Sequence, residues 1–149
     1  MKYRHTFEVQ APLAEVVDFH TSAASLKAIT PPLIPMQLHH APQQMGDGDE
    51  MAFTMWLGPL PARWEARVED VSPAGFLDRQ LRGPFASWSH RHRFLALDEG
   101  WTEVVDEVEA RLKPHLLWGA VGLAMWIGLP LLFAYRAWKT RRLLEAGAA

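Results

Sequence analysis

Two histidines and an aspartate are the residues of this sequence best suited to chemistry. His90 and His92 are two residues apart in a segment that alternates polar and apolar side chains, which is typical of a strand. Residues at this spacing point to the same face of a sheet. Asp106 falls on the otherwise apolar face of the next predicted strand. Because a buried carboxylate needs a hydrogen-bonding or cationic partner, and an imidazole can supply one, we expect the three side chains to form a polar cluster.

The hairpin that carries these residues also predicts how they pair. A tight loop at residues 98–100 sets His92 opposite Asp106 on the inner face of the two strands. The same register sets Arg91 opposite Glu107 on the outer face. A shift by one residue would mix the polar and apolar faces, so we expect the register that satisfies both.

Three roles are open for the cluster. An interior pair with its hydrogen bonds satisfied would fix the register of the two strands. A functional pair would orient a polar group of a bound molecule or move a proton on it, which makes His90, His92 and Asp106 the candidate catalytic residues. Two histidines and one aspartate also resemble a metal-binding triad, but interior pairs are much commoner, and we expect no metal and no cofactor.

The rest of the sequence predicts the elements that hold this cluster. Alternating side chains predict a first strand at residues 3–9. Apolar residues at helical spacing then predict two short helices, at residues 12–20 and 23–29. Turn residues separate six further predicted strands, at residues 36–41, 49–57, 62–71, 76–82, 87–97 and 101–113. With a long C-terminal helix, this order indicates a single α+β domain over residues 1–149.

The composition is globular and rich in aromatic rings. Hydrophobic residues make up 49% of the chain and charged residues 21%, and there are 7 Trp and 7 Phe against 2 Tyr. Rings without hydroxyl groups are suitable walls for an apolar cavity. We therefore expect a ligand site lined by the inward-facing residues Phe53, Met55, Trp64, Trp88, His90, His92, Phe94, Asp106, Met125 and Trp126.

Charge and cysteine content exclude several classes of function. Lys and Arg total 15 against 17 Asp and Glu, and the formal net charge of -2 gives no basic excess for nucleic-acid binding. The sequence has no cysteine, which excludes disulfides, thiolate metal sites and thiol nucleophiles. The first ten residues contain no apolar run of the kind found in secretory signals. Together these features predict a cytoplasmic protein.

An uncharged segment at residues 116–135 has about the length of a membrane-spanning helix. Arg136, Lys139 and Arg142 follow it in a helical stripe that we expect to face solvent. Pro130 would remove a backbone hydrogen bond from a long helix and kink it. Because the predicted sheet needs a helix to cover it and this is the only long candidate, we expect a core helix here, with a membrane-associated protein as the alternative.

The second half of the sequence resembles a known family. Three segments carry the resemblance: RGPFASWSHRHRF at 82–94, TEVVDEVEARL at 102–112 and AYRAWKTRRLL at 134–144. They look like the ligand-binding SRPBCC proteins of the START and Bet v 1 superfamily, some of which are polyketide cyclase/dehydrase-like. The matching positions are Gly83, Pro84, Phe85, Trp88, His90, His92, Phe94, Thr102, Asp106, Tyr135 and Arg136.

This resemblance implies a helix-grip fold, in which a curved antiparallel sheet of about seven strands wraps around a long C-terminal helix. It also implies a hydrophobic cavity between sheet and helix. The apolar segment at residues 116–132 is longer than the usual approach to that helix, so it either extends the cavity wall or docks on a membrane surface.

Three functions remain open at this point. The favoured function is non-enzymatic binding or transport of a small hydrophobic molecule that is lipid-, polyketide- or aromatic-like, by a monomer or homodimer. The second is a cyclase or dehydratase that uses His90, His92 and Asp106. The third is membrane association through residues 116–135, and peripheral membrane contact is compatible with the first.

Overall fold

The computed structural model describes residues 1–98 and 100–146, and its elements follow the predicted order. The strands are β1 (Lys2–Val9), β2 (Met36–His40), β3 (Glu50–Leu57), β4 (Leu60–Ser72), β5 (Gly75–Arg82), β6 (Phe85–Asp98) and β7 (Trp101–Leu112). The helices are α1 (Leu13–His20), α2 (Ala23–Ala28), α3 (Leu116–Ile127) and α4 (Leu129–Ala146). Glu99 of the predicted loop and residues 147–149 of the predicted domain lie outside the described residues.

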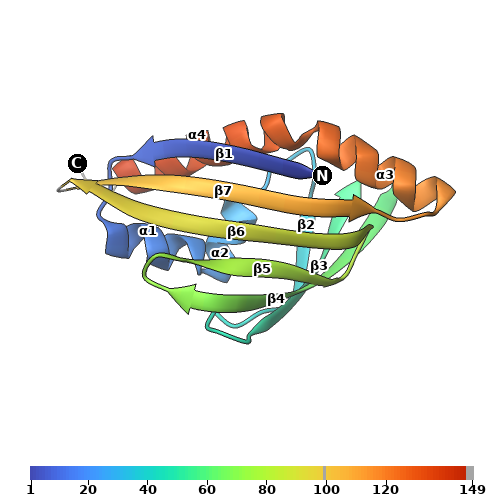
Figure 1. The fold of residues 1–149 in the computed structure, drawn as a ribbon, viewed down its shortest axis with the longest axis horizontal. Helices are drawn as coiled ribbons and strands as arrows, with labels where there is room; N and C mark the ends of the chain where they lie inside the picture. Colours follow the sequence, from blue (N-terminus) through green and yellow to red (C-terminus); the bar gives the residue numbers. More distant parts are fainter. Residues whose placement is uncertain (99, 147–149) are drawn as a thin grey trace.

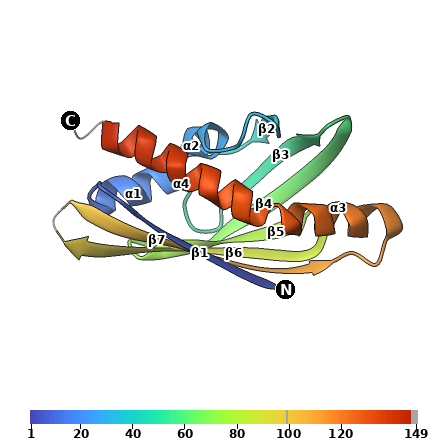
Figure 2. The ribbon, with the colours of Figure 1, turned by 90° about the horizontal axis from the view of Figure 1, so that it is seen from above.

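The seven strands form one antiparallel sheet in the order β1-β7-β6-β5-β4-β3-β2. From β2 to β7 each strand pairs with the next one along the chain, and β1 closes the far edge against β7 (Figure 1). Figure 2 shows that the sheet curves and that α4 crosses its concave side, with α1 and α2 covering one end. The predicted α+β helix-grip architecture is therefore confirmed.

The pairing of β6 with β7 is the predicted one at the centre of the hairpin. His92 lies opposite Asp106, and Arg91 lies opposite Glu107. Near the turn a bulge places Asp98 opposite Trp101. Because side chains alternate between faces, this register puts both histidines and the aspartate on the inner, concave side of the sheet.

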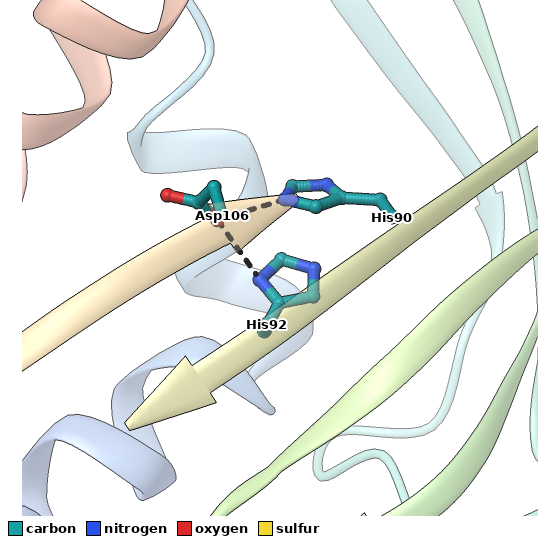
Figure 3. A group of neighbouring side chains, drawn as sticks. All are labelled: His90, His92 and Asp106. Atoms are coloured by element: carbon teal, nitrogen blue, oxygen red, sulfur yellow. Dashed lines mark hydrogen bonds and ion pairs between the residues drawn. The ribbon is translucent and has the colours of Figure 1, made fainter. Parts of the chain in front are cut away.

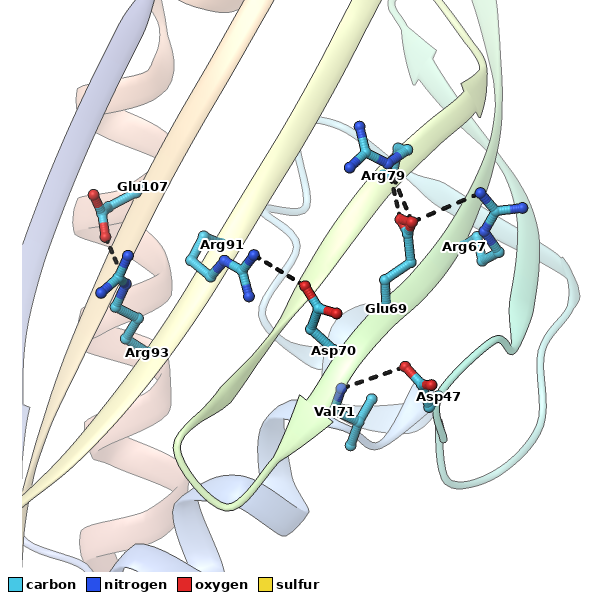
Figure 4. Close-up of polar contacts among 9 residues, drawn as sticks. All are labelled: Asp47, Arg67, Glu69, Asp70, Val71, Arg79, Arg91, Arg93 and Glu107. Atoms are coloured by element: carbon cyan, nitrogen blue, oxygen red, sulfur yellow. Dashed lines mark hydrogen bonds and ion pairs between the residues drawn. The ribbon is translucent and has the colours of Figure 1, made fainter.

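Ion pairs cover the outer face of the same strands (Figure 4). Arg93 Nε lies 2.8 Å from Glu107 Oε1, and Arg91 Nη2 lies 3.2 Å from Asp70 Oδ2. Arg91 thus turns toward β4, while its backbone partner Glu107 pairs with Arg93. Exposed pairs of this kind contribute little stability each, but they show which face of the sheet is solvated.

The C-terminal region forms two helices rather than one, with a bend of 49° between them. Gly128 follows the end of α3, and Pro130 falls in the first turn of α4, where its missing N–H removes no helical hydrogen bond. The break therefore lies where Pro130 predicted a kink. Within the described residues no single helix is long and apolar enough to cross a membrane, although the bent pair α3 and α4 together meets that test.

The two C-terminal helices pack against the sheet in different ways. Leu129, Phe133 and Ala137 lie one turn apart on α4 and are buried. Helix α3 approaches the sheet closely at Gly122, where an added Cβ would lie 3.0 Å from Leu112 and 3.4 Å from Phe85. A larger residue at this position would require the side chain of Leu112 to shift.

Candidate functional site

A cavity of about 440 Å³ lies between the sheet and the C-terminal helices. Residues from β3 to β6 form one wall, and residues from α3 and α4 form the other. Six of the residues predicted to line a ligand site do line it, namely Phe53, Met55, Trp64, Trp88, His90 and Met125. The volume is within the range of pockets that hold drug-sized molecules.

The other four predicted residues lie elsewhere in the core. His92 borders a smaller cavity of about 40 Å³. Phe94, Asp106 and Trp126 are absent from the described linings of both cavities. Phe94 is buried beside Phe76, and Trp126 packs edge-on against the ring of Tyr3. For these four residues, contact with a ligand stays a prediction.

The predicted polar cluster forms in the structure (Figure 3). His90, His92 and Asp106 are all buried, and His90 Nε2 lies 2.8 Å from Asp106 Oδ1. An ionised carboxylate only accepts hydrogen bonds, so Nε2 of His90 donates and its Nδ1 is the unprotonated nitrogen. Asp106 therefore fixes the tautomer of a histidine that lines the cavity.

His92 lies between two carboxylates without a hydrogen bond to either. Its Nδ1 is 3.5 Å from Asp106 Oδ1, and its Nε2 is 3.8 Å from Asp78 Oδ2. The ring is held by stacking, with centroid distances of 4.2 Å to Phe76 and 3.8 Å to His90. Packing rather than hydrogen bonding therefore fixes the orientation of His92.

Burial keeps the interior histidines neutral. It lowers the pKa of His90 to about 3, and the positive charge of Arg136 acts in the same direction. Burial also lowers the pKa of His92, with His90 as the next cause. On α1, burial lowers the pKa of His20 to about 4. At neutral pH these rings can accept or donate hydrogen bonds but carry no charge.

A metal ion would require a different arrangement of the cluster. One ligand atom from each of His90, His92 and Asp106 lies within 4.8 Å of the others. The two imidazole rings are stacked, however, with an angle of 28° between their planes. An imidazole binds a metal along a lone pair in its ring plane, so two stacked rings do not aim at one ion. The geometry fits a hydrogen-bonded cluster.

Four polar residues of the cavity wall were not predicted as site residues, and one of them is Thr30, which precedes β2. Asp78 and Gln80 reach it from β5, and Arg136 reaches it from α4. The amide of Gln80 bonds the backbone N–H and C=O of Phe85 at 3.2 and 2.9 Å, which stabilises the β5–β6 turn. Arg136 corrects the predicted solvated stripe: its Nε is buried, whereas Arg142 on the same helix is exposed as expected.

Simple spacing could have revealed two of these residues. Asp78 shares the inner face of β5 with Phe76, two residues before it. Arg136 follows the buried Leu129 and Phe133 at intervals of seven and three residues, so it lies on the same side of α4. The basic residues that follow it at 139, 141 and 142 hid this pattern, because such a run is usually solvated.

Solved structures of other proteins share this architecture. An aromatase/cyclase from a Streptomyces species superposes with a TM-score of 0.69 at 20% identity, covering 99% of this chain and 98% of that one. A START superfamily protein from Mycobacterium smegmatis gives 0.66 at 10% identity, covering 97% of both chains. This chain has the helix-grip fold of the START and Bet v 1 proteins.

A third structure extends the comparison to a plant enzyme. Norcoclaurine synthase from Thalictrum flavum, in complex with dopamine and hydroxybenzaldehyde, gives a TM-score of 0.72 at 15% identity over 98% of this chain and 87% of that one. No protein-family model matches the sequence, and no curated protein matches it either. At these identities the comparisons establish the helix-grip fold, and a fold by itself does not fix a function.

Proposed function

We propose that this protein binds a small hydrophobic molecule in the cavity between its sheet and its C-terminal helices. The observation that carries the proposal is the cavity of about 440 Å³ with walls of aromatic and aliphatic side chains. A void of this size is unusual in a domain interior, because interiors are close-packed and each unfilled space lowers stability. The shared fold supports the proposal, since the compared structures include an aromatase/cyclase and a synthase in complex with dopamine and hydroxybenzaldehyde.

Native mass spectrometry tests this function directly. Protein purified without detergent should carry an apolar adduct that is released on denaturation and can then be identified. Ala66 is buried and lines the cavity, so Ala66→Phe should fill the space and remove the adduct. Ala86 is exposed on β6, and Ala86→Phe is the matched control. If wild type and both variants carry no adduct and bind no apolar probe, the proposal is wrong.

A second candidate function is catalysis by His90, which the hydrogen bond from Asp106 favours. The pair leaves the unprotonated Nδ1 of His90 as a general base in a cavity with mainly apolar walls. Because its pKa is lowered to about 3, His90 is unprotonated across the physiological pH range. On this hypothesis His92 and Asp106 position His90 rather than contact the substrate.

The two functions differ in what happens to the bound molecule. The adduct extracted from the wild type is added to adduct-free protein, and its mass and isomer composition are followed with time. A carrier returns the molecule unchanged. An enzyme converts it, and His90→Gln should then abolish conversion while binding is retained. Conversion at the wild-type rate by His90→Gln would exclude the catalytic role of this residue.

Peripheral membrane contact through α3 is compatible with the binding function. Leu116 and Ile127 of α3 are 94% and 70% exposed, and Leu131 in the first turn of α4 is 80% exposed, which is unusual for residues of this size. The other side of α3 lines the cavity with Val121 and Met125. An extension of the cavity wall was one of the two alternatives expected for residues 116–132. The same helix would then contact both the membrane surface and the ligand.

A further inference from the structure

Arg136 is the one cation in the described wall of the large cavity. It also borders the smaller cavity, so its side chain lies at the junction of the two. Its Nε is buried and has no hydrogen-bond partner among the described residues. Within the same residues, no carboxylate oxygen lies within 4.0 Å of its guanidinium nitrogens. Arg136 is therefore a cation placed in an apolar wall without a close ion pair.

An unpaired cation in an apolar wall lowers the stability of the protein when no ligand is bound. The residue as a whole is half-buried, and burial around its guanidinium lowers the pKa of Arg136 despite the opposing effect of Asp106 and Asp78. A charge that is partly removed from water in this way gains from a close partner. The guanidinium does contact the ring of Phe133, with Cζ 5.7 Å from the centroid. A cation–π contact of this kind satisfies none of the five N–H donors.

We propose that Arg136 binds the carboxylate of an amphipathic ligand whose apolar body occupies the large cavity. The guanidinium is suited to this because it can donate two parallel hydrogen bonds to one carboxylate. The aromatic wall formed by Phe53, Trp64 and Trp88 then contacts the body of the ligand. This inference rests on the proposed binding function and names the chemical class of the ligand.

The other charged groups around Arg136 limit the ligand to one carboxylate. Asp78 lines both cavities beside Arg136, and its Oδ1 has no hydrogen-bond partner. His90, His92 and His20 are neutral and offer no second positive charge. A second carboxylate would therefore meet Asp78 without a cation to offset the repulsion. The site should prefer monocarboxylates to dicarboxylates of equal length.

Three probes that share one apolar body test the proposal: decanoate, decan-1-ol and decylamine. Binding is followed by the fluorescence of Trp64 and Trp88, which line the cavity. The wild type should bind decanoate roughly 10- to 100-fold more tightly than decan-1-ol, because a hydrogen bond to a charged partner is added. Arg136→Gln should remove this preference and leave the affinity for decan-1-ol unchanged. Arg142→Gln, an exposed change of the same kind, should keep the preference.

The outcomes separate this inference from the binding function on which it rests. Equal binding of decanoate and decan-1-ol by the wild type would overturn the carboxylate site and leave the apolar cavity supported. Preference for decylamine would mean that Asp78 binds the polar group of the ligand. This outcome would also overturn the carboxylate site at Arg136. Failure of all three probes to bind would overturn the carboxylate site, and it would reject the binding function as well if the purified protein also carries no adduct.

Thermal unfolding distinguishes a ligand-binding arginine from a structural one. Because Arg136 has no close ion pair in the free protein, Arg136→Gln should unfold at the same temperature as the wild type or at a higher one. Addition of decanoate should raise the midpoint of the wild type by more than that of Arg136→Gln, which keeps only the weaker binding of the apolar body. A large fall in the midpoint of Arg136→Gln, with equal loss of affinity for acid and alcohol, would show that the residue is structural.

Discussion

The hydrogen bond between His90 and Asp106 predicts different effects for two substitutions of the same residue. Asp106→Asn keeps an oxygen that can accept from His90 Nε2, so the free energy of unfolding should fall only slightly. Asp106→Leu leaves that buried N–H without an acceptor and should lower the free energy of unfolding by about 1–3 kcal/mol. Urea denaturation of the two variants and the wild type measures the difference. Equal stability of Asp106→Leu and the wild type would show that the pair does not hold the two strands together.

The buried histidines predict that acid destabilises the fold. Burial lowers the pKa of His20 to about 4 and of His90 to about 3, well below the value of about 6.5 for an exposed histidine. Between these values the unfolded chain binds more protons than the folded one, so stability rises with pH. The stability is fully present above about pH 6.5 and is lost as the pH falls. Each such histidine contributes a slope of up to about 1.4 kcal/mol per pH unit.

Measurements between pH 5 and 6.5 isolate this effect, because carboxylates titrate mainly below that window. The free energy of unfolding of His90→Asn should rise less steeply with pH than that of the wild type. The difference in slope should approach the contribution of one proton, about 1.4 kcal/mol per pH unit. Substitution of the exposed His40 by Asn is the matched control. An unchanged slope in His90→Asn would mean that this imidazole is protonated in the folded protein.

At the scale of single elements, Gly75 at the start of β5 permits the close approach of β5 to β6. Its φ is 143°, and an added Cβ would lie 1.9 Å from the backbone oxygen of His92. Gly75→Ala should therefore displace the strand that carries His92 and lower the free energy of unfolding by more than about 1 kcal/mol. Chemical denaturation measures the loss, and the NMR signals of the His92 ring report the displacement.

Gly48 provides the control for this prediction. Its φ is 84°, but no atom lies within 4 Å of an added Cβ, so a substitution there adds backbone strain without a clash. Asn adopts positive φ at low cost, and Gly48→Asn should be nearly neutral, whereas Gly75→Asn should be as damaging as Gly75→Ala. If both Asn variants were equally stable, the close contact with β6 would not be the reason for the glycine.

The elements differ in how well the sequence predicts them. The β6–β7 register was readable because a one-residue shift would bury charged side chains, and the pairing of His92 with Asp106 follows from it. Pro130 predicted the position of the helix break. The volume of the cavity could not be predicted from the sequence, because it depends on how the rings of Trp64 and Trp88 pack. The role of Arg136 depends on the distances to its neighbours, which no spacing rule supplies.

At the scale of the whole molecule, α3 is apolar on both of its sides. The side with Val121 and Met125 lines the cavity, and the opposite side exposes Leu116, Leu123 and Ile127. A helix that only covered a cavity would carry polar residues on its outer side. Lining the cavity does not explain why these three side chains on the outer side of α3 are apolar. Contact with a lipid surface does explain it.

A vesicle-binding measurement decides whether α3 contacts membranes. The wild type should sediment with phosphatidylcholine vesicles, because apolar side chains gain free energy when they leave water. Replacement of Leu116, Leu123 and Ile127 by Gln should reduce the partition coefficient by more than roughly tenfold, since full burial of each such side chain contributes about 1.5–3 kcal/mol. The thermal midpoint should change little, because all three positions are exposed.

The matched control replaces Leu95 and Leu97 by Gln, because both are exposed on β6, away from α3. These changes remove apolar surface of a similar kind and should leave vesicle binding intact. Equal loss in both variants would indicate general hydrophobic adsorption, and absence of binding by the wild type would reject a membrane role for α3. Selective loss in the α3 variant, with decanoate affinity unchanged, would place membrane contact and ligand binding on opposite sides of one helix.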